Sequence, residues 1–198
     1  MIAVIVLEKF GGIKKLFKAG DLIFKEGNQP LYYHQIISGE VKMNNYNDEG
    51  KEFIQGIFYK NLCFGEPPLF TDQAYPANAV AVTDCEIITI TKSKLLELLK
   101  NNPDISLKMI KNLSQRLYYK SVMAAEISSQ DPEHRVLRLI DYSIEQFHFK
   151  KENAGFLINF TRQQIADLTG LRVETVIRAI KSLEKKGDLK IINRKVYR

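Results

Sequence analysis

The segment 161–186 restricts the possible folds of this chain more than any other part of its sequence. Thr161 can cap the start of a helix, and Gln164, three residues later, completes the capping-box pattern. Ala166 is small enough to let a second helix cross closely. Gly170 can take the left-handed backbone conformation that a tight turn between two helices needs. The spacing therefore predicts two short helices joined by a tight turn.

The second of these helices is expected over about residues 172–186, and it has one apolar and one polar face. The apolar residues that would lock the two helices together are Ile165, Leu171, Val176 and Ile180. The residues expected to face outward are Arg172, Glu174, Thr175, Arg178, and Lys181 or Ser182. Gly187 would end the helix, and residues 189–197 are typical of a small hairpin with Arg194 or Lys195 at its tip. Together they predict a winged helix-turn-helix.

The basic excess of the chain lies in the same segment. The chain has 29 basic and 23 acidic residues, and its last 38 residues hold 10 basic and 4 acidic ones, which leaves 19 of each sign in residues 1–160. A local basic excess is what binding to phosphate backbones requires. A basic, well-solvated tail would give the same count, so charge alone leaves both readings open.

Residues 17–90 have the pattern of an all-β domain. Short runs of Val, Ile, Phe and Tyr alternate with turn residues, which favours a β-sandwich or a β-barrel. The turn 47–50 (NDEG) lies between two such runs, so a hairpin is expected there. The run 80–90 fits two strands or one bent strand. Ser93 is expected to cap a short helix that follows. The fold class is therefore α+β, with a jelly-roll-like β-roll first.

A long helix is expected from Asp104 to about Ser128, after Pro103. Its apolar residues recur at spacings of three, four and seven, and they are Ile110, Leu113, Leu117 and Ala124. This narrow stripe favours pairing with a second copy of the chain. The alternative is a helix that packs only on its own domain.

Other classes of protein are disfavoured by what the sequence lacks. It has no run of 18 apolar residues, so no membrane partner is expected. Its two cysteines, Cys63 and Cys85, form no C-x-x-C pair, so no disulfide framework, zinc site or iron–sulfur cluster is expected. The histidines, His34, His134 and His148, are scattered, and no metal site is expected. No nucleophile–base pair or phosphate loop indicates an enzyme. A reducing, cytoplasmic location is the expectation.

Over nearly its whole length, the chain resembles the Crp/Fnr family of bacterial transcription regulators. The motifs that carry the resemblance are residues 17–27 (FKAGDLIFKEG), 37–41 (ISGEV), 64–66 (FGE), 161–170 (TRQQIADLTG) and 173–178 (VETVIR). The resemblance implies a cyclic-nucleotide-binding-type β-roll over residues 1–100, a dimerisation helix over 101–130 and a winged helix-turn-helix DNA-binding domain over 131–198.

The resemblance also implies which residues contact DNA. Glu174, Thr175 and Arg178 would read bases, because Arg can donate twice to guanine and Glu can accept from cytosine. Phosphate contacts are expected from Thr161, Arg162, Gln163, Arg172, Lys181, Arg194 and Lys195. The four-residue spacing of Glu174 and Arg178 also allows an ion pair within the helix. Val173 and Ile177 depart from the residues usual in the cyclic-AMP-responsive branch, which leaves the outer half-site base open.

The effector cassette departs further from the family pattern. Gly65 and Glu66 match it, but Tyr75, Pro76 and Ala77 stand where the family has the phosphate-binding Arg and the residue after it. No Lys or Arg occurs between Lys60 and Lys92. A buried phosphate without a cation carries a large desolvation cost. Cyclic AMP is therefore not expected to bind, and the effector is unknown.

The leading hypothesis is a homodimeric, sequence-specific transcription regulator with an effector domain. Its expected partners are double-stranded DNA at a near-palindromic site, a second copy of itself, RNA polymerase and an unidentified small molecule. The alternative is an effector-binding β-roll whose helical C-terminal part mediates protein interactions only.

Overall fold

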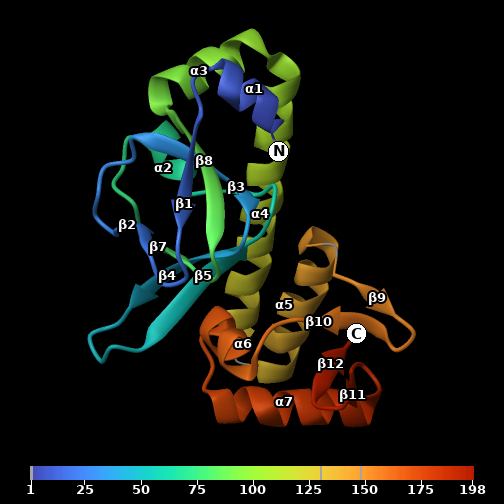
Figure 1. Cartoon of the computed structure of the whole chain (residues 1–198). Coiled ribbons are helices and arrows are strands. Elements are labelled where there is room, and N and C mark those ends of the chain that lie inside the picture. Colours follow the sequence, from blue (N-terminus) through green and yellow to red (C-terminus); the bar gives the residue numbers. More distant parts are fainter. Residues whose placement is uncertain (1, 130, 148) are drawn as a thin grey trace. The chain divides into compact units, whose positions relative to one another are not determined.

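The computed structural model describes residues 2–129, 131–147 and 149–198, so His148 lies outside the described residues. The chain divides into two compact units, Met1–Leu113 (unit 1) and Ser114–Arg198 (unit 2). Their boundary falls inside the long helix α4, Pro103–Ser129, which contributes its first part to unit 1 and its second part to unit 2 (Figure 1). The helix predicted from Asp104 to about Ser128 is thus confirmed.

Unit 1 holds two four-stranded antiparallel sheets. The first has the order β1 (Ile13–Phe17), β8 (Cys85–Thr91), β3 (Tyr32–Ser38), β6 (Cys63–Phe64). The second has the order β2 (Leu22–Phe24), β7 (Asn78–Ala81), β4 (Val41–Tyr46), β5 (Glu52–Phe58). The predicted hairpin joins β4 to β5 with Gly50 at a φ of 75°. The run 80–90 forms two strands, β7 and β8, so the all-β prediction for this region is confirmed.

Strand β8 is apolar on both faces because each face covers a different core. Cys85 and Ile87 point into the roll and pack in a cluster with Phe24, Phe64 and Tyr75. Ile88 and Ile90 face the other way and pack against Leu95 and Leu98 of the covering helix. A continuous apolar run is the expected sequence pattern of a strand that is buried on both sides.

Three short helices complete unit 1, and two of them correct the sequence predictions. Helix α3, Lys92–Asn101, begins one residue earlier than expected, because Thr91 rather than Ser93 accepts the capping hydrogen bond from the Lys94 amide. Helix α1, Val4–Lys9, was not predicted. It buries Leu7, and Gln35 fixes the chain just before it through two hydrogen bonds to the Ile2 backbone. Helix α2 spans Pro67–Thr71.

Unit 2 places three helices beside a small antiparallel sheet. The helices are α5 (Pro132–Phe147), α6 (Arg162–Thr169) and α7 (Val173–Lys186). The sheet has the order β11 (Lys190–Ile192), β12 (Lys195–Tyr197), β10 (Gly155–Ile158), β9 (Lys151–Glu152). Asp131 caps α5, as expected, by accepting from the amides of Glu133 and His134. The predicted winged helix-turn-helix is present.

A buried arginine ties the ends of two helices to α5. Arg135 donates to the backbone carbonyl of Ile127 near the end of α4 and to that of Thr169 at the end of α6, each at 3.2 Å. The last carbonyls of a helix have no partner within the helix, so a cation there satisfies them and complements the helix dipole. Arg135 thereby fixes the end of α6, and with it the turn into α7.

Candidate nucleic-acid interface and effector pocket

The start of α6 is built as its sequence predicts. The Thr161 hydroxyl accepts from the Gln164 amide at 3.1 Å, and the Gln164 side chain accepts from the Thr161 amide at 2.8 Å. Both halves of the capping box are therefore present. Arg162 and Gln163 follow in the first turn, and the Gln163 amide group donates to Asp167 at 2.8 Å. This bond holds the Gln163 side chain along the helix.

The turn between α6 and α7 depends on Gly170. Its φ of 69° is left-handed, and its amide donates to the Ala166 carbonyl as the cap of α6. Ala166 is buried where the two helices cross, and Ile165, Val176 and Ile180 are buried with it. Leu171 is half-buried. The crossing predicted from the sequence is therefore confirmed.

The outer face of α7 carries the predicted base-reading residues. Glu174, Arg178 and Lys181 are exposed, and Thr175 is half-buried. The structure describes both Glu174 and Arg178 and records no hydrogen bond or ion pair between them, so the predicted alternative of an ion pair within the helix is not formed. Both side chains are directed to solvent from one face of the helix.

The start of α6, the outer face of α7 and the wing enclose one hollow of 590 Å³. Thr161 and Arg162 line it from α6, Ile177 lines it from α7, and Arg194 and Lys195 line it from the wing. Partial burial lowers the pKa of the Arg162 guanidinium. The structure therefore brings together four of the seven residues predicted to contact phosphate, from segments that are far apart in the sequence.

The cations around this hollow are not committed to carboxylates. Within the part of the chain that the structure describes, no hydrogen bond or ion pair involves the side chains of Arg162, Arg172, Arg178, Lys181, Arg194 and Lys195. Other basic side chains of unit 2 are paired: Lys186 with Glu133 at 2.6 Å and Arg198 with Asp141 at 2.7 Å. The available positive charge thus lies on the side that α6, α7 and the wing share.

The wing turn holds its arginine in an uncommon backbone conformation. Asn193 and Arg194 join β11 to β12 with φ values of 50° and 66°. Two successive left-handed residues form the type I′ turn that suits a two-residue hairpin, and glycine is the favoured second residue. Arg194 occupies that second position despite its side chain, which is typical of a position kept for function.

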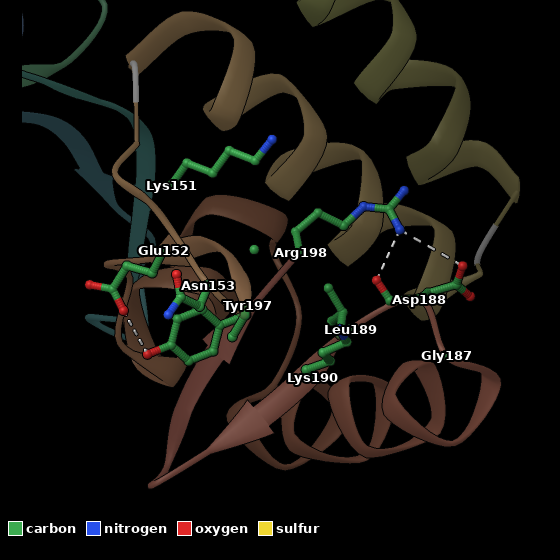
Figure 2. A pocket seen from close by; sticks show the side chains of 11 residues that line it. Lys151, Glu152, Asn153, Gly187, Asp188, Leu189, Lys190, Tyr197 and Arg198 are labelled. Atoms are coloured by element: carbon green, nitrogen blue, oxygen red, sulfur yellow. Dashed lines mark hydrogen bonds and ion pairs between the residues drawn. The ribbon is translucent and has the colours of Figure 1, made fainter.

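A second hollow of 410 Å³ lies between β9, β10, β12 and the end of α7 (Figure 2). Figure 2 shows that its charged groups bind one another. The Tyr197 hydroxyl donates to Glu152 at 3.1 Å, and Arg198 donates to the Asp188 carbonyl at 2.9 Å. Because these groups satisfy each other, this hollow presents less uncommitted charge than the first.

In unit 1, the predicted effector pocket is filled by aromatic side chains of the chain itself. Tyr75 is only 4% exposed, and its ring stacks on that of Phe24 with centroids 3.7 Å apart and planes 8° apart. Phe24 also contacts His34 and Phe64, with centroids 5.4 Å and 5.9 Å apart. Burial raises the pKa of Tyr75 to about 12 and lowers that of His34 to about 4, so both rings are neutral near pH 7.

The other residues of the predicted pocket lie around this stack. Gly65 has a φ of 68°, and a Cβ there would come within 2.6 Å of the Phe24 ring. Glu66 and Ala77 are buried, whereas Pro76 is exposed. Phe24 and His34 were not predicted to belong to the pocket, because no local pattern connects them with residues 65–77.

Comparison with known proteins follows the same division of the chain. The family model of the cyclic nucleotide-binding domain matches residues 14–102, and that of the Crp-like helix-turn-helix domain matches residues 134–197. The fold and the site thus define a DNA-binding regulator that joins a sensor β-roll to a winged helix-turn-helix.

Related proteins agree with this class. The cAMP-activated global transcriptional regulator CRP of Haemophilus influenzae is 31% identical over 179 residues, which are 90% of this chain and 77% of that protein. The CRP-like cAMP-activated regulator of Mycobacterium tuberculosis is 24% identical over 181 residues, 91% of this chain and 81% of that protein. This chain belongs to the Crp/Fnr family of transcription regulators, a family of DNA-binding proteins rather than enzymes.

Solved structures share the fold. The c-di-GMP-responsive global regulator CLP of Xanthomonas campestris has a TM-score of 0.77 at 22% identity, with 98% of both chains covered. FixK2 of Bradyrhizobium japonicum has a TM-score of 0.76 at 18% identity, with 94% of this chain and 91% of that chain covered. Among the residues that the structure describes, no helix is long and apolar enough to cross a membrane.

The wing turn gives a prediction in which stability and DNA binding change in opposite directions. Arg194→Gly should raise the free energy of unfolding by about 1 kcal/mol, because glycine adopts the left-handed conformation without a steric cost. The same change removes a cation, so DNA binding should weaken on all sequences and the salt slope should fall by about one per chain. Urea unfolding and fluorescence anisotropy at several salt concentrations would measure the two effects.

Arg194→Ala is the matched control, because it removes the same charge but keeps a side chain at the left-handed position. It should weaken DNA binding equally without the gain in stability. Wild-type DNA affinity in Arg194→Gly would remove the wing from the interface.

Proposed function

We propose that this regulator acts as a homodimer on near-palindromic DNA, with one α7 in the major groove of each half-site. The observation that carries this proposal is the exposed polar face of α7, flanked by the uncommitted cations of α6 and the wing. In helix-turn-helix dimers, two such helices bind half-sites about one helical turn apart. RNA polymerase is the proposed protein partner, and the cytoplasm, where the DNA is, is the proposed location.

Base reading is assigned to Glu174, Thr175 and Arg178. An arginine at the centre of the face can donate to O6 and N7 of guanine, and a glutamate one turn earlier can accept from a cytosine amino group. The absence of an ion pair between Glu174 and Arg178 supports this assignment, since both side chains keep their hydrogen-bonding capacity for bases. A TGA-like core of the half-site, as in the family, would place Arg178 on its guanine.

Phosphate binding is assigned to the residues around the hollow and to the start of α7. The free amides at the start of α6 favour an anion there. Thr161, Arg162 and Gln163 would contact one phosphate run, and Arg194 and Lys195 of the wing another. The exposed Arg172 and Lys181 lie toward the two ends of the reading face.

Dimerisation is assigned to an apolar stripe on α4. Ile110 and Leu117 are 58% and 66% exposed, and Ala124 is exposed one heptad further on. Leu113 packs partly against the core of unit 1, so it supports the seam from its side. An exposed apolar stripe with heptad spacing is typical of a helix that pairs with another.

The sensor domain is proposed to respond to an effector other than a cyclic nucleotide bound in the usual way. Tyr75 fills the space where the family cassette places a cation, and its ring is stacked on Phe24. A cyclic phosphate in this site would be buried without a positive partner.

The first test separates base reading from phosphate binding. Arg178→Ala should lose about 1–3 kcal/mol per half-site and relax the base preference at one position. Arg162→Ala should weaken binding to all sequences similarly and lower the salt slope by about one per chain. Selection of sites from random DNA, followed by salt titrations, measures both effects. Lys100→Ala, an exposed lysine of unit 1, is the control for charge alone.

An unchanged site preference in Arg178→Ala would show that α7 does not read bases. In that case the basic residues would anchor DNA without regard to its sequence, and the proposed function would be wrong.

The dimer seam is tested by Leu117→Glu. Two like charges in an apolar seam should separate the copies, and the exposed position leaves the fold of each copy intact. Analytical ultracentrifugation should show monomers for this variant and dimers for the wild type. Gln115→Glu places the same charge on another face of α4 and should stay dimeric. Dimers of Leu117→Glu with wild-type stability would disprove the seam.

The effector assignment predicts that cyclic AMP and cyclic GMP do not bind. Isothermal titration calorimetry should show no binding heat at concentrations in the micromolar range, because Tyr75 occupies the phosphate position. Micromolar affinity for either nucleotide would show that residues 75–77 do not align with the phosphate-binding part of the cassette.

A further inference from the structure

One side chain on the outer face of α7 does not fit the polar character of that face. Ile177 is 39% exposed, although its neighbours on the same face, Glu174, Arg178 and Lys181, are polar. The core side of the helix is filled by Val176, Ala179, Ile180 and Leu183, so Ile177 is not needed there. Single exposed apolar residues are common on protein surfaces, and exposure alone assigns no role.

The position of Ile177 supplies the second observation. It lines the 590 Å³ hollow together with Arg162, Arg194 and Lys195, the cations proposed to hold the DNA backbone. It also lies next to Arg178 and three residues after Glu174, within the proposed base-reading set. A duplex held by those cations would therefore bring a base edge close to the Ile177 side chain.

The chemistry of the major groove leaves one partner for such a side chain. An isoleucine neither donates nor accepts a hydrogen bond, and the only apolar group at a base edge in the major groove is the C5 methyl group of thymine. We propose that Ile177 determines specificity by contacting a thymine methyl group next to the guanine read by Arg178. This inference rests on the proposed function and adds one base to the site that α7 reads.

A purely structural role is the competing explanation, since Ile177 could serve only to pack against the wing. That role predicts a loss of stability on truncation but no dependence on a methyl group of the DNA. Replacing thymine by uracil removes this methyl group and keeps every hydrogen-bonding group of the base. The substitution therefore distinguishes the two roles.

The experiment uses the duplex that the full-length wild-type protein selects from random DNA. Each thymine of one half-site is replaced in turn by uracil, and fluorescence anisotropy gives the affinity. At one position next to the guanine, wild type should bind about four-fold more weakly, the factor that corresponds to burial of one methyl group. Ile177→Ala should bind the thymine and uracil duplexes equally at that position.

Two controls accompany this test. Ile192→Ala truncates another exposed isoleucine, in strand β11, and should keep the wild-type sensitivity to uracil. Thermal unfolding should show that Ile177→Ala is folded, and Ile177→Val should keep part of the sensitivity to uracil.

The outcomes separate this inference from the proposed function. Sequence-selective binding that is insensitive to uracil at every thymine would overturn the role of Ile177 and leave the proposed function intact. A uracil penalty that persists in Ile177→Ala would also overturn it, because another residue would then read the methyl group. Absence of any sequence-selective binding by the wild type would refute the proposed function and this inference together.

Discussion

The geometry of the DNA-binding unit depends on the buried guanidinium of Arg135. Its bonds to the Ile127 and Thr169 carbonyls satisfy acceptors at two helix ends that have no partner within their own helices. A shorter cation could not reach both carbonyls from one position on α5. Removing it would leave polar groups buried without partners, a larger loss than that of a surface ion pair such as Arg138 with Glu126.

Because α6 is held at its end, the turn at Gly170 determines where α7 points. The capping box at Thr161 fixes the other end of α6, so both ends of this short helix are satisfied by defined partners. The reading face therefore rests on a rigid support, and its long side chains are the mobile part. This arrangement suits recognition, since specificity requires the base-reading groups to be held in register with the phosphate contacts.

The sequence predicts best those elements that local chemistry determines. The capping box, the left-handed glycines and the apolar spacing of residues 161–187 each involve neighbours in the chain, and the structure confirms them. The contact between Phe24 and Tyr75 joins two strands distant in sequence, so no local pattern reveals it. Helix α1 is short and depends on burial of Leu7 and on the bonds from Gln35, which are again tertiary contacts. Thr91 replaced Ser93 as a cap because strand β8 continues up to it.

The aromatic stack in the sensor domain has a consequence for the kinetics of any ligand that uses this site. Such a ligand can enter only when the Tyr75 ring has left Phe24, so it binds a minor conformation of the free protein. Its apparent affinity is the intrinsic affinity reduced by the population of that open state. The rate at which the ring swings out also sets an upper limit on the rate of association. The chain thus carries a built-in competitor for its own sensor site, present at a fixed effective concentration.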